Sequence, residues 1–290
     1  VSGLSLYDSL KNKKQPECLA LPWTALQDLT YGLRRGEMWT ITAGSGMGKT
    51  QVLRELAYHI QHNSEDNIGM MFFEEPLDDS ARGMLSLGAN KPLHLPTTEI
   101  TGEEFDEAFK NTLGSDRYHF FESFGSTNID AVISAIRYLA LGCDCKYIFL
   151  DHISILVSDQ SQGDERKALD EIATKLKTLT IELNIWLGMV SHSKRPSGKS
   201  HEEGGQTSLS ELRGTAGIGQ LSNMVLGLER DGQNPDPTIR NTTLIRVLKN
   251  RFSGLTGPST YLHYDRDTSR LTETFPDDIE EVVEEFEELK

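Results

Sequence analysis

The chain has 290 residues, of which 37% are hydrophobic and 25% charged, and its formal net charge is −15 at pH 7. This length accommodates one large α/β domain with extensions or two small domains. No apolar run reaches the length of a membrane span, and the first residues lack the charged start and apolar block of a secretory signal. We therefore expect a cytoplasmic protein with no membrane partner, and the start at Val1 suggests a fragment of a longer protein.

Cysteine usage agrees with a reducing compartment, since only Cys18, Cys143 and Cys145 occur in the chain. Cys143 and Cys145 form a C-x-C pair beside an expected strand. The sequence offers no further metal ligands near this pair, so ordinary thiols are expected there.

Residues 1–21 are predicted to form a peripheral arm. Leu4, Tyr7 and Leu10 have helical spacing, and the polar run KNKKQ follows them. Two interpretations of this arm remain open. It is either a frayed terminus or a segment that docks on a neighbouring subunit.

From Trp23 onward, apolar runs typical of strands alternate with segments of helical periodicity. This order predicts an α/β fold with a mostly parallel central sheet flanked by helices and with late antiparallel strands. We expect one domain over residues 22–274, followed by a tail over residues 275–290. Strands are expected near residues 37–42, 68–73, 118–121, 146–150, 185–190, 223–229, 242–248 and 259–264. Helices are expected near residues 49–61, 78–88, 103–112, 128–140, 165–183 and 211–221.

The first of these strands leads into the sequence AGSGMGKT, which predicts a phosphate-binding P-loop. Three glycines let the backbone turn so that its N–H groups point at phosphate oxygens, and the following helix adds its positive end. A lysine would reach the β- and γ-phosphates, and the last hydroxyl would ligate Mg²⁺. The first position departs from the usual glycine, and the alternative is a chance glycine turn. The segment comprises Ala43, Gly44, Ser45, Gly46, Met47, Gly48, Lys49 and Thr50.

Two later strands end in carboxylates. KYIFLDH ends its apolar run at Asp151, the position of a carboxylate that holds Mg²⁺ in a hydrolysing P-loop protein. IGMMFFEE ends in Glu74 and Glu75. We expect Glu74 to face the nucleotide and deprotonate water, and Glu75 to face the other way. The alternative is that both acids cap the helix that starts near Asp78.

Further polar residues follow the later strands. IWLGMVSH ends at His192, a candidate γ-phosphate sensor. The loop after it carries Lys194, Arg195 and Lys199 and no acid, so it is a candidate nucleic-acid loop on an acidic chain. Arg251 lies in a turn between two late strands and could act as an arginine finger in a neighbouring subunit's site.

Together these elements resemble the RecA-type motor domain of replicative hexameric DNA helicases, a family that includes DnaB and Twinkle. They are most similar to the helicase half of the primase–helicases of short-tailed phages, although no primase half is found in this chain. The resemblance runs from about Trp23 to Leu271. It rests on GSGMGKT, the strand ending in Glu74 and Glu75, LDHIS, KSHEEG, ELRGTAGIGQLSN, LER and LKNRFSG, in that order.

The resemblance implies a role for each matching residue. Lys49 would hold phosphate, and Thr50 and Asp151 would hold Mg²⁺. Glu74 would act as the base, and His192 would sense the γ-phosphate. Further residues would take part in the nucleotide site. Gln220 would link the state of the nucleotide to DNA, and Arg251 would be the arginine finger, with Lys249 beside it. Arg230 and Tyr264 would enclose the nucleobase. DNA would meet the loop from Lys194 to Lys199, which is one residue shorter here, and the turn at Arg213 and Gly214. Gly219 departs from the family's polar residue, which leaves Arg213 and backbone N–H groups as the contacts of that turn.

The resemblance also implies partners and setting. It points to a hexameric ring that encircles single-stranded DNA, moves 5′ to 3′ and excludes the other strand, with Mg²⁺ and either ATP or dTTP as substrate. The setting would be the cytoplasm of a phage-infected bacterium. Residues 275–290 hold eight acids and one lysine and resemble the tail by which phage members hold their DNA polymerase. A solvated acidic terminus is the alternative.

Two other functions remain open at this point. One is a filament scaffold of the wider RecA superfamily, in which ATP switches assembly on DNA. The other is a regulatory ATPase that binds protein and does not move on DNA. Closed rings favour the helicase over the scaffold, and hydrolysis that responds to single-stranded DNA excludes the regulatory ATPase.

Overall fold

A nine-stranded sheet organises the computed structural model, which describes residues 2–13, 17–122, 128–157, 162–193, 199–201, 203–212 and 216–275, with the backbone alone at 162–166 and 216. The strands are β1 (Cys18–Leu19), β2 (Leu33–Arg34), β3 (Met38–Ala43), β4 (Asn67–Phe72), β5 (Tyr118–Phe120), β6 (Cys145–Asp151), β7 (Trp186–His192), β8 (Met224–Glu229), β9 (Thr242–Asn250), β10 (Gly257–Asp265) and β11 (Arg270–Thr274). The helices are α1 (Tyr7–Lys11), α2 (Thr24–Thr30), α3 (Lys49–Asn63), α4 (Leu77–Ala89), α5 (Gly102–Lys110), α6 (Ile129–Leu141), α7 (Gln162–Glu182), α8 (Ala216–Leu221) and α9 (Pro237–Arg240).

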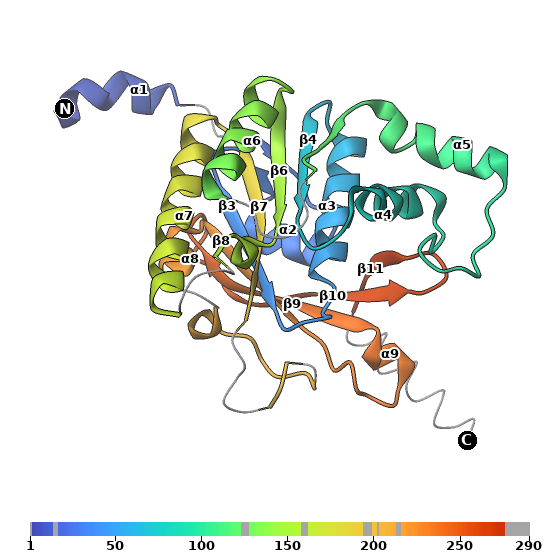
Figure 1. Ribbon diagram of the computed structural model, residues 1–290. Coiled ribbons are helices and arrows are strands. Elements are labelled where there is room, and N and C mark those ends of the chain that lie inside the picture. The colour runs from blue at the N-terminus through green and yellow to red at the C-terminus, as the bar shows by residue number, and fades with distance from the viewer. Residues whose placement is uncertain are drawn as a thin grey trace.

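The sheet order is β11-β10-β9-β8-β3-β7-β6-β4-β5, and β1 pairs with β2 in a separate two-stranded sheet (Figure 1). Strands β3 to β8 pair in parallel, whereas β9, β10 and β11 pair antiparallel to their neighbours. The predicted fold class is therefore confirmed. Strand β3, which delivers the P-loop, lies in the middle of the sheet between β7 and β8.

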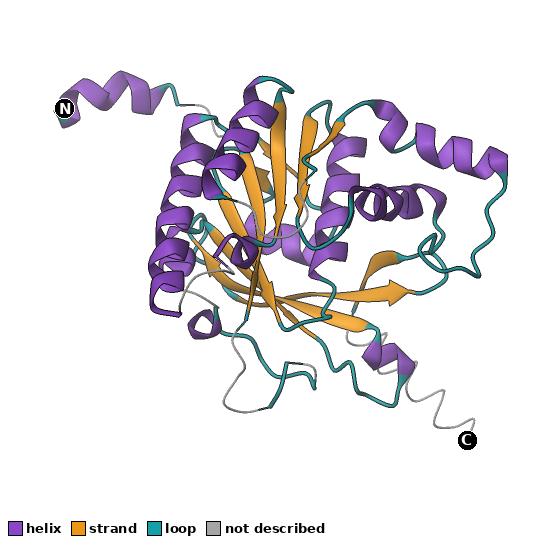
Figure 2. Ribbon diagram, viewed as in Figure 1, coloured by secondary structure: helices purple, strands orange, loops and turns teal. Residues whose placement is uncertain are grey.

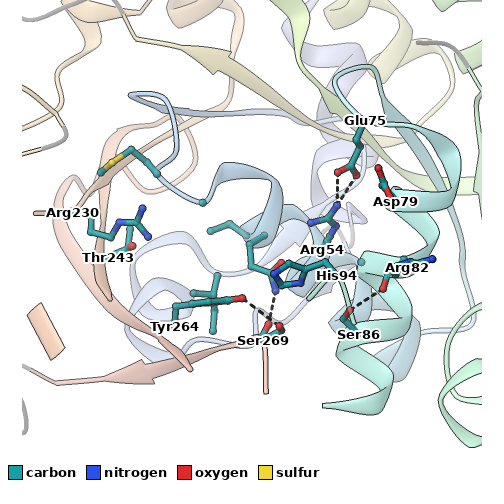
Figure 3. Close-up of a pocket in the computed structure, with 16 residues that line it drawn as sticks. Arg54, Glu75, Asp79, Arg82, Ser86, His94, Arg230, Thr243, Tyr264 and Ser269 are labelled. Carbon is teal, nitrogen blue, oxygen red and sulfur yellow. Dashed lines mark hydrogen bonds and ion pairs between the residues drawn. The ribbon is translucent and has the colours of Figure 1, made fainter. Parts of the chain in front are cut away.

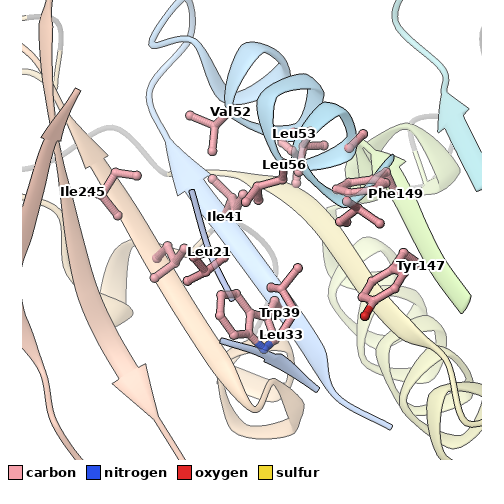
Figure 4. Packing of buried hydrophobic residues seen from close by; sticks show 14 of the residues in the cluster. Leu21, Leu33, Trp39, Ile41, Val52, Leu53, Leu56, Tyr147, Phe149 and Ile245 are labelled. Carbon is pink, nitrogen blue, oxygen red and sulfur yellow. The ribbon is translucent and has the colours of Figure 1, made fainter. Parts of the chain in front are cut away.

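Helices cover both faces of the parallel half of the sheet (Figure 2). On one face, Val52, Leu53 and Leu56 of α3 pack over Ile41 and Phe149 in a single buried cluster (Figure 4). On the other face, a second cluster joins α6 and α7 to the sheet. Because parallel strands are buried on both faces, their sequences are almost continuously apolar. This is why they could be recognised from sequence.

The expected helix over residues 211–221 is wrong at its start. A 3-10 turn occupies Leu209–Glu211 and Leu212 is extended, whereas α8 covers Ala216–Leu221. Leu212 is buried and forms an isolated bridge to Ser193, which holds its backbone extended. The Glu211 carboxylate accepts a hydrogen bond from the Ser208 N–H as part of a capping box. Tertiary pairing with the end of β7 thus overrides the local helical pattern.

The first helix and the last strand of the domain were not predicted, and they are joined to each other. The Glu273 carboxylate of β11 accepts hydrogen bonds from the N–H groups of Thr24 and Ala25, at 2.7 and 3.0 Å, and from the Thr260 hydroxyl. The acid therefore stabilises the amino end of α2 from 249 residues away in the chain.

The amino-terminal arm contains a 3-10 turn (Gly3–Leu6) and α1 and extends away from the body of the protein (Figure 1). None of its described residues is buried, and Leu4 is 87% exposed. The helical spacing predicted there is present. Its apolar side chains, Leu4, Leu6, Tyr7 and Leu10, face solvent in the single chain.

Candidate functional site

The polar residues expected at strand ends meet at one edge of the sheet. Register places Ala43 of β3 beside His192 of β7, and Phe72 of β4 beside Asp151 of β6. Glu74 lies two residues beyond Phe72. Since these strands are parallel, their carboxyl ends gather the P-loop, Asp151, His192 and Glu74 in one place.

The P-loop turns through glycines at left-handed conformations. Gly46 has φ 69° and Gly48 has φ 85°, values that side chains strongly disfavour. Lys49 is buried, and its Nζ donates to the Gly44 carbonyl at 2.7 Å and the Ala43 carbonyl at 3.4 Å. Burial lowers the Lys49 pKa, while the charges of Asp151 and Glu74 oppose that shift. The ammonium is thus held inside the loop where phosphate oxygens would replace the carbonyls.

Thr50 and Asp151 form the candidate metal site. The Thr50 hydroxyl donates to Asp151 Oδ2 at 2.5 Å, and Asp151 is only 3% exposed. Burial raises the Asp151 pKa, and the Thr50 hydrogen bond counters that effect. A buried carboxylate and a hydroxyl are hard oxygen ligands that fit Mg²⁺, which also retains waters and phosphate oxygens in its shell.

Glu74 meets two imidazoles at this edge. His152 Nε2 lies 2.8 Å from Glu74 Oε1 and His192 Nε2 lies 3.8 Å from the same oxygen. The two rings pack edge to face with their centroids 4.3 Å apart. The three ligand atoms lie within 4.8 Å of one another, but two imidazoles suit zinc better than magnesium. Sequence reasoning did not single out His152, although its position directly after Asp151 at a strand end was the available signal.

Glu75 faces away from the side of Glu74, as expected, and its carboxylate pairs with Arg54. Both of its carboxylate oxygens accept from Arg54 Nη2 at 2.6 Å, and Oε1 also accepts from the Ser80 hydroxyl at 2.8 Å. Helix α4 starts after Pro76 without a side-chain cap. The alternative that Glu74 and Glu75 cap this helix is therefore wrong.

A pocket of 520 Å³ opens beside the P-loop, and Arg230 and Tyr264 lie on one side of it (Figure 3). Arg230 Nη2 donates to the Gly46 carbonyl, and burial lowers the Arg230 pKa. Met47 and Gly48 line the same space. The guanidinium and the phenol ring predicted to enclose a nucleobase thus share one cavity with the phosphate-binding turn.

Arg251, Lys249 and Gln220 lie at the opposite edge of the sheet. Lys249 Nζ donates to the Gly219 and Gln220 carbonyls at 2.5 and 2.8 Å, and Arg251 also donates to the Gln220 carbonyl. Burial and the neighbouring Arg251 charge lower the Lys249 pKa to about 8. The structure therefore does not bring these three residues to the P-loop of their own chain.

Most of the expected DNA contacts lie outside the described residues: Lys194, Arg195, Arg213 and Gly214. The expected polymerase-binding tail also lies outside them beyond Phe275. Lys199 is described and exposed. The chain that follows it returns to the P-loop, where a Cβ on Gly44 would lie 2.9 Å from His201 Cβ. Thr207 anchors the same segment, since its N–H and hydroxyl both donate to the Glu229 carboxylate.

No helix within the described ranges has the length and apolar character needed to cross a membrane.

A family model described as the DnaB-like helicase C terminal domain matches residues 19–273.

Two curated relatives extend this match. A DNA helicase/primase of Enterobacteria phage T3 is 36% identical over 281 residues, which are 93% of this chain and 49% of the relative. The replicative DNA helicase DnaB of Geobacillus stearothermophilus is 22% identical over 254 residues, 84% of this chain and 55% of the relative. The chain thus spans about half the length of the curated relatives it matches.

Solved structures show the same fold. One of them, an isolated ATPase domain, superposes with a TM-score of 0.73 at 16% identity, covering 94% of this chain and 97% of that one. A second structure, of a DnaB-like replicative helicase and its interactions with primase, also superposes with a TM-score of 0.73, at 17% identity. The match covers 93% of this chain and 66% of that one. A RecA-like ATPase fold is thereby established for this chain.

Proposed function

This chain belongs to the DnaB-like helicase C-terminal domain family, and from that premise we propose that it is the motor of a ring-forming replicative DNA helicase. The motor would span residues 22–274. The observation that carries the proposal is a separation within the sheet. Lys49, Thr50, Asp151, His192 and Glu74 lie at one edge and Arg251 at the other, an arrangement that suits a hydrolytic site completed by a neighbouring subunit.

The first edge would bind a nucleoside triphosphate with Mg²⁺. Lys49 would compensate phosphate charge, and Thr50 with Asp151 would hold the metal ion, which neutralises charge on the phosphates when bound. Glu74 is half exposed, so its carboxylate could accept a proton from an attacking water. His192 lies beside the P-loop strand and would sense the γ-phosphate. Arg230 and Tyr264 would enclose the base of ATP or dTTP by stacking.

The second edge would complete a neighbouring subunit's site. Arg251 would supply the finger that stabilises charge in the transition state, and Lys249 and Gln220 would lie at the same seam. Such a head-to-tail contact closes into a ring when the rotation between subunits permits, and we propose six subunits. The arm would secure this contact. Its exposed Leu4 and Tyr7 would dock in a neighbouring subunit's groove of 560 Å³ beside α4 and α5, whose lining includes Leu95, Phe105 and Phe109.

Single-stranded DNA would pass through the ring and meet Lys194, Arg195, Lys199, Arg213 and Gly214 through its phosphates, largely without regard to sequence. We propose 5′ to 3′ movement on the encircled strand. The acidic tail, residues 275–290, would hold the replicative DNA polymerase. The relationship to a phage T3 protein supports an infected bacterial cytoplasm as the setting.

The test is NTP-dependent unwinding of a forked duplex with a 5′ tail, a 3′ tail or both. Unwinding that requires the 5′ tail supports the proposed helicase and its direction. DNA-stimulated hydrolysis without unwinding, together with open filaments in electron micrographs, would favour the recombination scaffold. Hydrolysis that does not respond to DNA would contradict both.

A further inference from the structure

His152 is the buried side chain that contacts Glu74, and the proposed reaction gives it no role. The imidazole is 10% exposed, whereas the Glu74 side chain is 49% exposed. His152 Nε2 and Glu74 Oε1 are 2.8 Å apart. A carboxylate on an open strand end can rotate freely, so a fixed donor decides where its oxygens lie.

The position of His152 is itself fixed by its surroundings. It directly follows Asp151, which is held by Thr50, and its ring packs edge to face on His192. Its Nδ1 is buried and has no hydrogen-bond partner within the part of the chain that the structure describes. An imidazole that carries its proton on Nε2 can donate to Glu74 Oε1 across the 2.8 Å that separates the two atoms.

We propose that His152 is the positioning residue for Glu74, which it holds at the strand edge shared with Asp151 and His192. This inference rests on the proposed role of Glu74 as the base. The contact of Nε2 with Oε1 would fix one carboxylate oxygen and leave the other to face an attacking water. The edge-to-face contact also makes His152 a common support for Glu74 and His192.

The experiment compares His152→Ala and His152→Gln in the full chain, by steady-state NTP hydrolysis, fluorescent-nucleotide binding and Mg²⁺ titration. Loss of the donor should lower kcat by up to about 100-fold, the size of effect that a misplaced catalytic group produces. Nucleotide affinity and the half-maximal Mg²⁺ concentration should stay unchanged. Glutamine can donate from its amide nitrogen and should restore most of kcat. His119→Ala, on the edge strand β5 beside Gly69, is the matched control and should leave all three measurements unchanged.

A double-variant cycle tests whether His152 acts through Glu74. In a Glu74→Gln background, His152→Ala should cause no further loss of kcat. Losses that multiply, a parallel fall in nucleotide or Mg²⁺ affinity, or a glutamine variant no better than alanine would overturn the inference. If Glu74→Gln alone retains full kcat, the role of Glu74 as base fails. If Glu74→Gln is inactive and His152→Ala is fully active, only the present inference fails.

Discussion

Arg251 and Lys49 of the same chain lie at opposite edges of the central sheet. The Arg251 N–H donates to the Asn223 carbonyl, and the Asn223 N–H donates to the carbonyl of Met38, the first residue of β3. The P-loop follows the far end of that strand. Since each strand residue advances about 3.3 Å, the six residues of β3 separate the two groups by roughly 20 Å along the sheet.

This separation predicts that Arg251 acts only on a neighbour's nucleotide. Arg251→Ala chains mixed with wild type at increasing ratios should lower NTP hydrolysis more steeply than the fraction of variant, because one altered chain impairs a site in another. Lys249→Ala, at the same edge of the sheet, provides the comparison. Activity that falls in direct proportion to the variant fraction would contradict a shared site.

Glu74→Gln should retain nucleotide binding and lose turnover, because the amide cannot accept a proton and the phosphate contacts of Lys49 are unaffected. The loss in kcat should be about 10²- to 10⁴-fold, the usual contribution of a general base. Lys49→Ala should instead impair nucleotide binding together with hydrolysis. Fluorescent-nucleotide titration and steady-state hydrolysis separate the two variants, and equal loss of affinity in both would exclude Glu74 as the base.

Gly44→Ala should disturb the contact between the P-loop and the segment after Lys199. The added methyl would lie 2.9 Å from His201 Cβ, so overpacking should cost about 1–3 kcal/mol of unfolding free energy. Nucleotide affinity should fall with it. His201→Gly removes the opposing Cβ and should restore binding in the double variant, whereas His201→Ala keeps that atom and should not. Thermal unfolding and nucleotide titration measure both effects, and equal rescue by both variants would rule out the contact.

Glu229 should make stability depend on pH. Its carboxylate lies 2.7 Å from Arg246 Nε and also accepts from Thr207. Burial favours the neutral acid, but the hydrogen bonds from Arg246 and Thr207 outweigh it and lower the Glu229 pKa below its ordinary 4.5. The ionised form of Glu229 therefore stabilises the fold at pH values above the ordinary pKa. That contribution is lost as the pH falls through the lowered pKa of the folded state.

Glu229→Gln should accordingly reduce the free energy of unfolding by about 3 kcal/mol at pH 7, because Arg246 is left unpaired. The difference from wild type should shrink as the pH falls below 4.5. Urea unfolding at pH 7 and pH 4 provides the comparison. A deficit of equal size at both pH values would show that the charge of Glu229 is not its cause.

Sequence reasoning was most successful where local pattern and chemistry coincide. The P-loop, Asp151 and His192 each end an apolar run of a buried parallel strand, so both the strand and its functional end could be predicted. The extended backbone at Leu212 could not be predicted, because it depends on an isolated bridge to Ser193, which directly follows β7. The role of His152 beside Glu74 depends equally on register, since β4 and β6 had to be paired before the two residues could be seen to meet.

The hydrogen bonds from Thr24 and Ala25 to Glu273 bring the two ends of the fold together. A domain whose ends meet can be reconnected there by a short linker and opened at a surface turn elsewhere. Circularly permuted subunits of this kind should fold around the same sheet. They would allow the arm and the tail to be relocated independently of the nucleotide site.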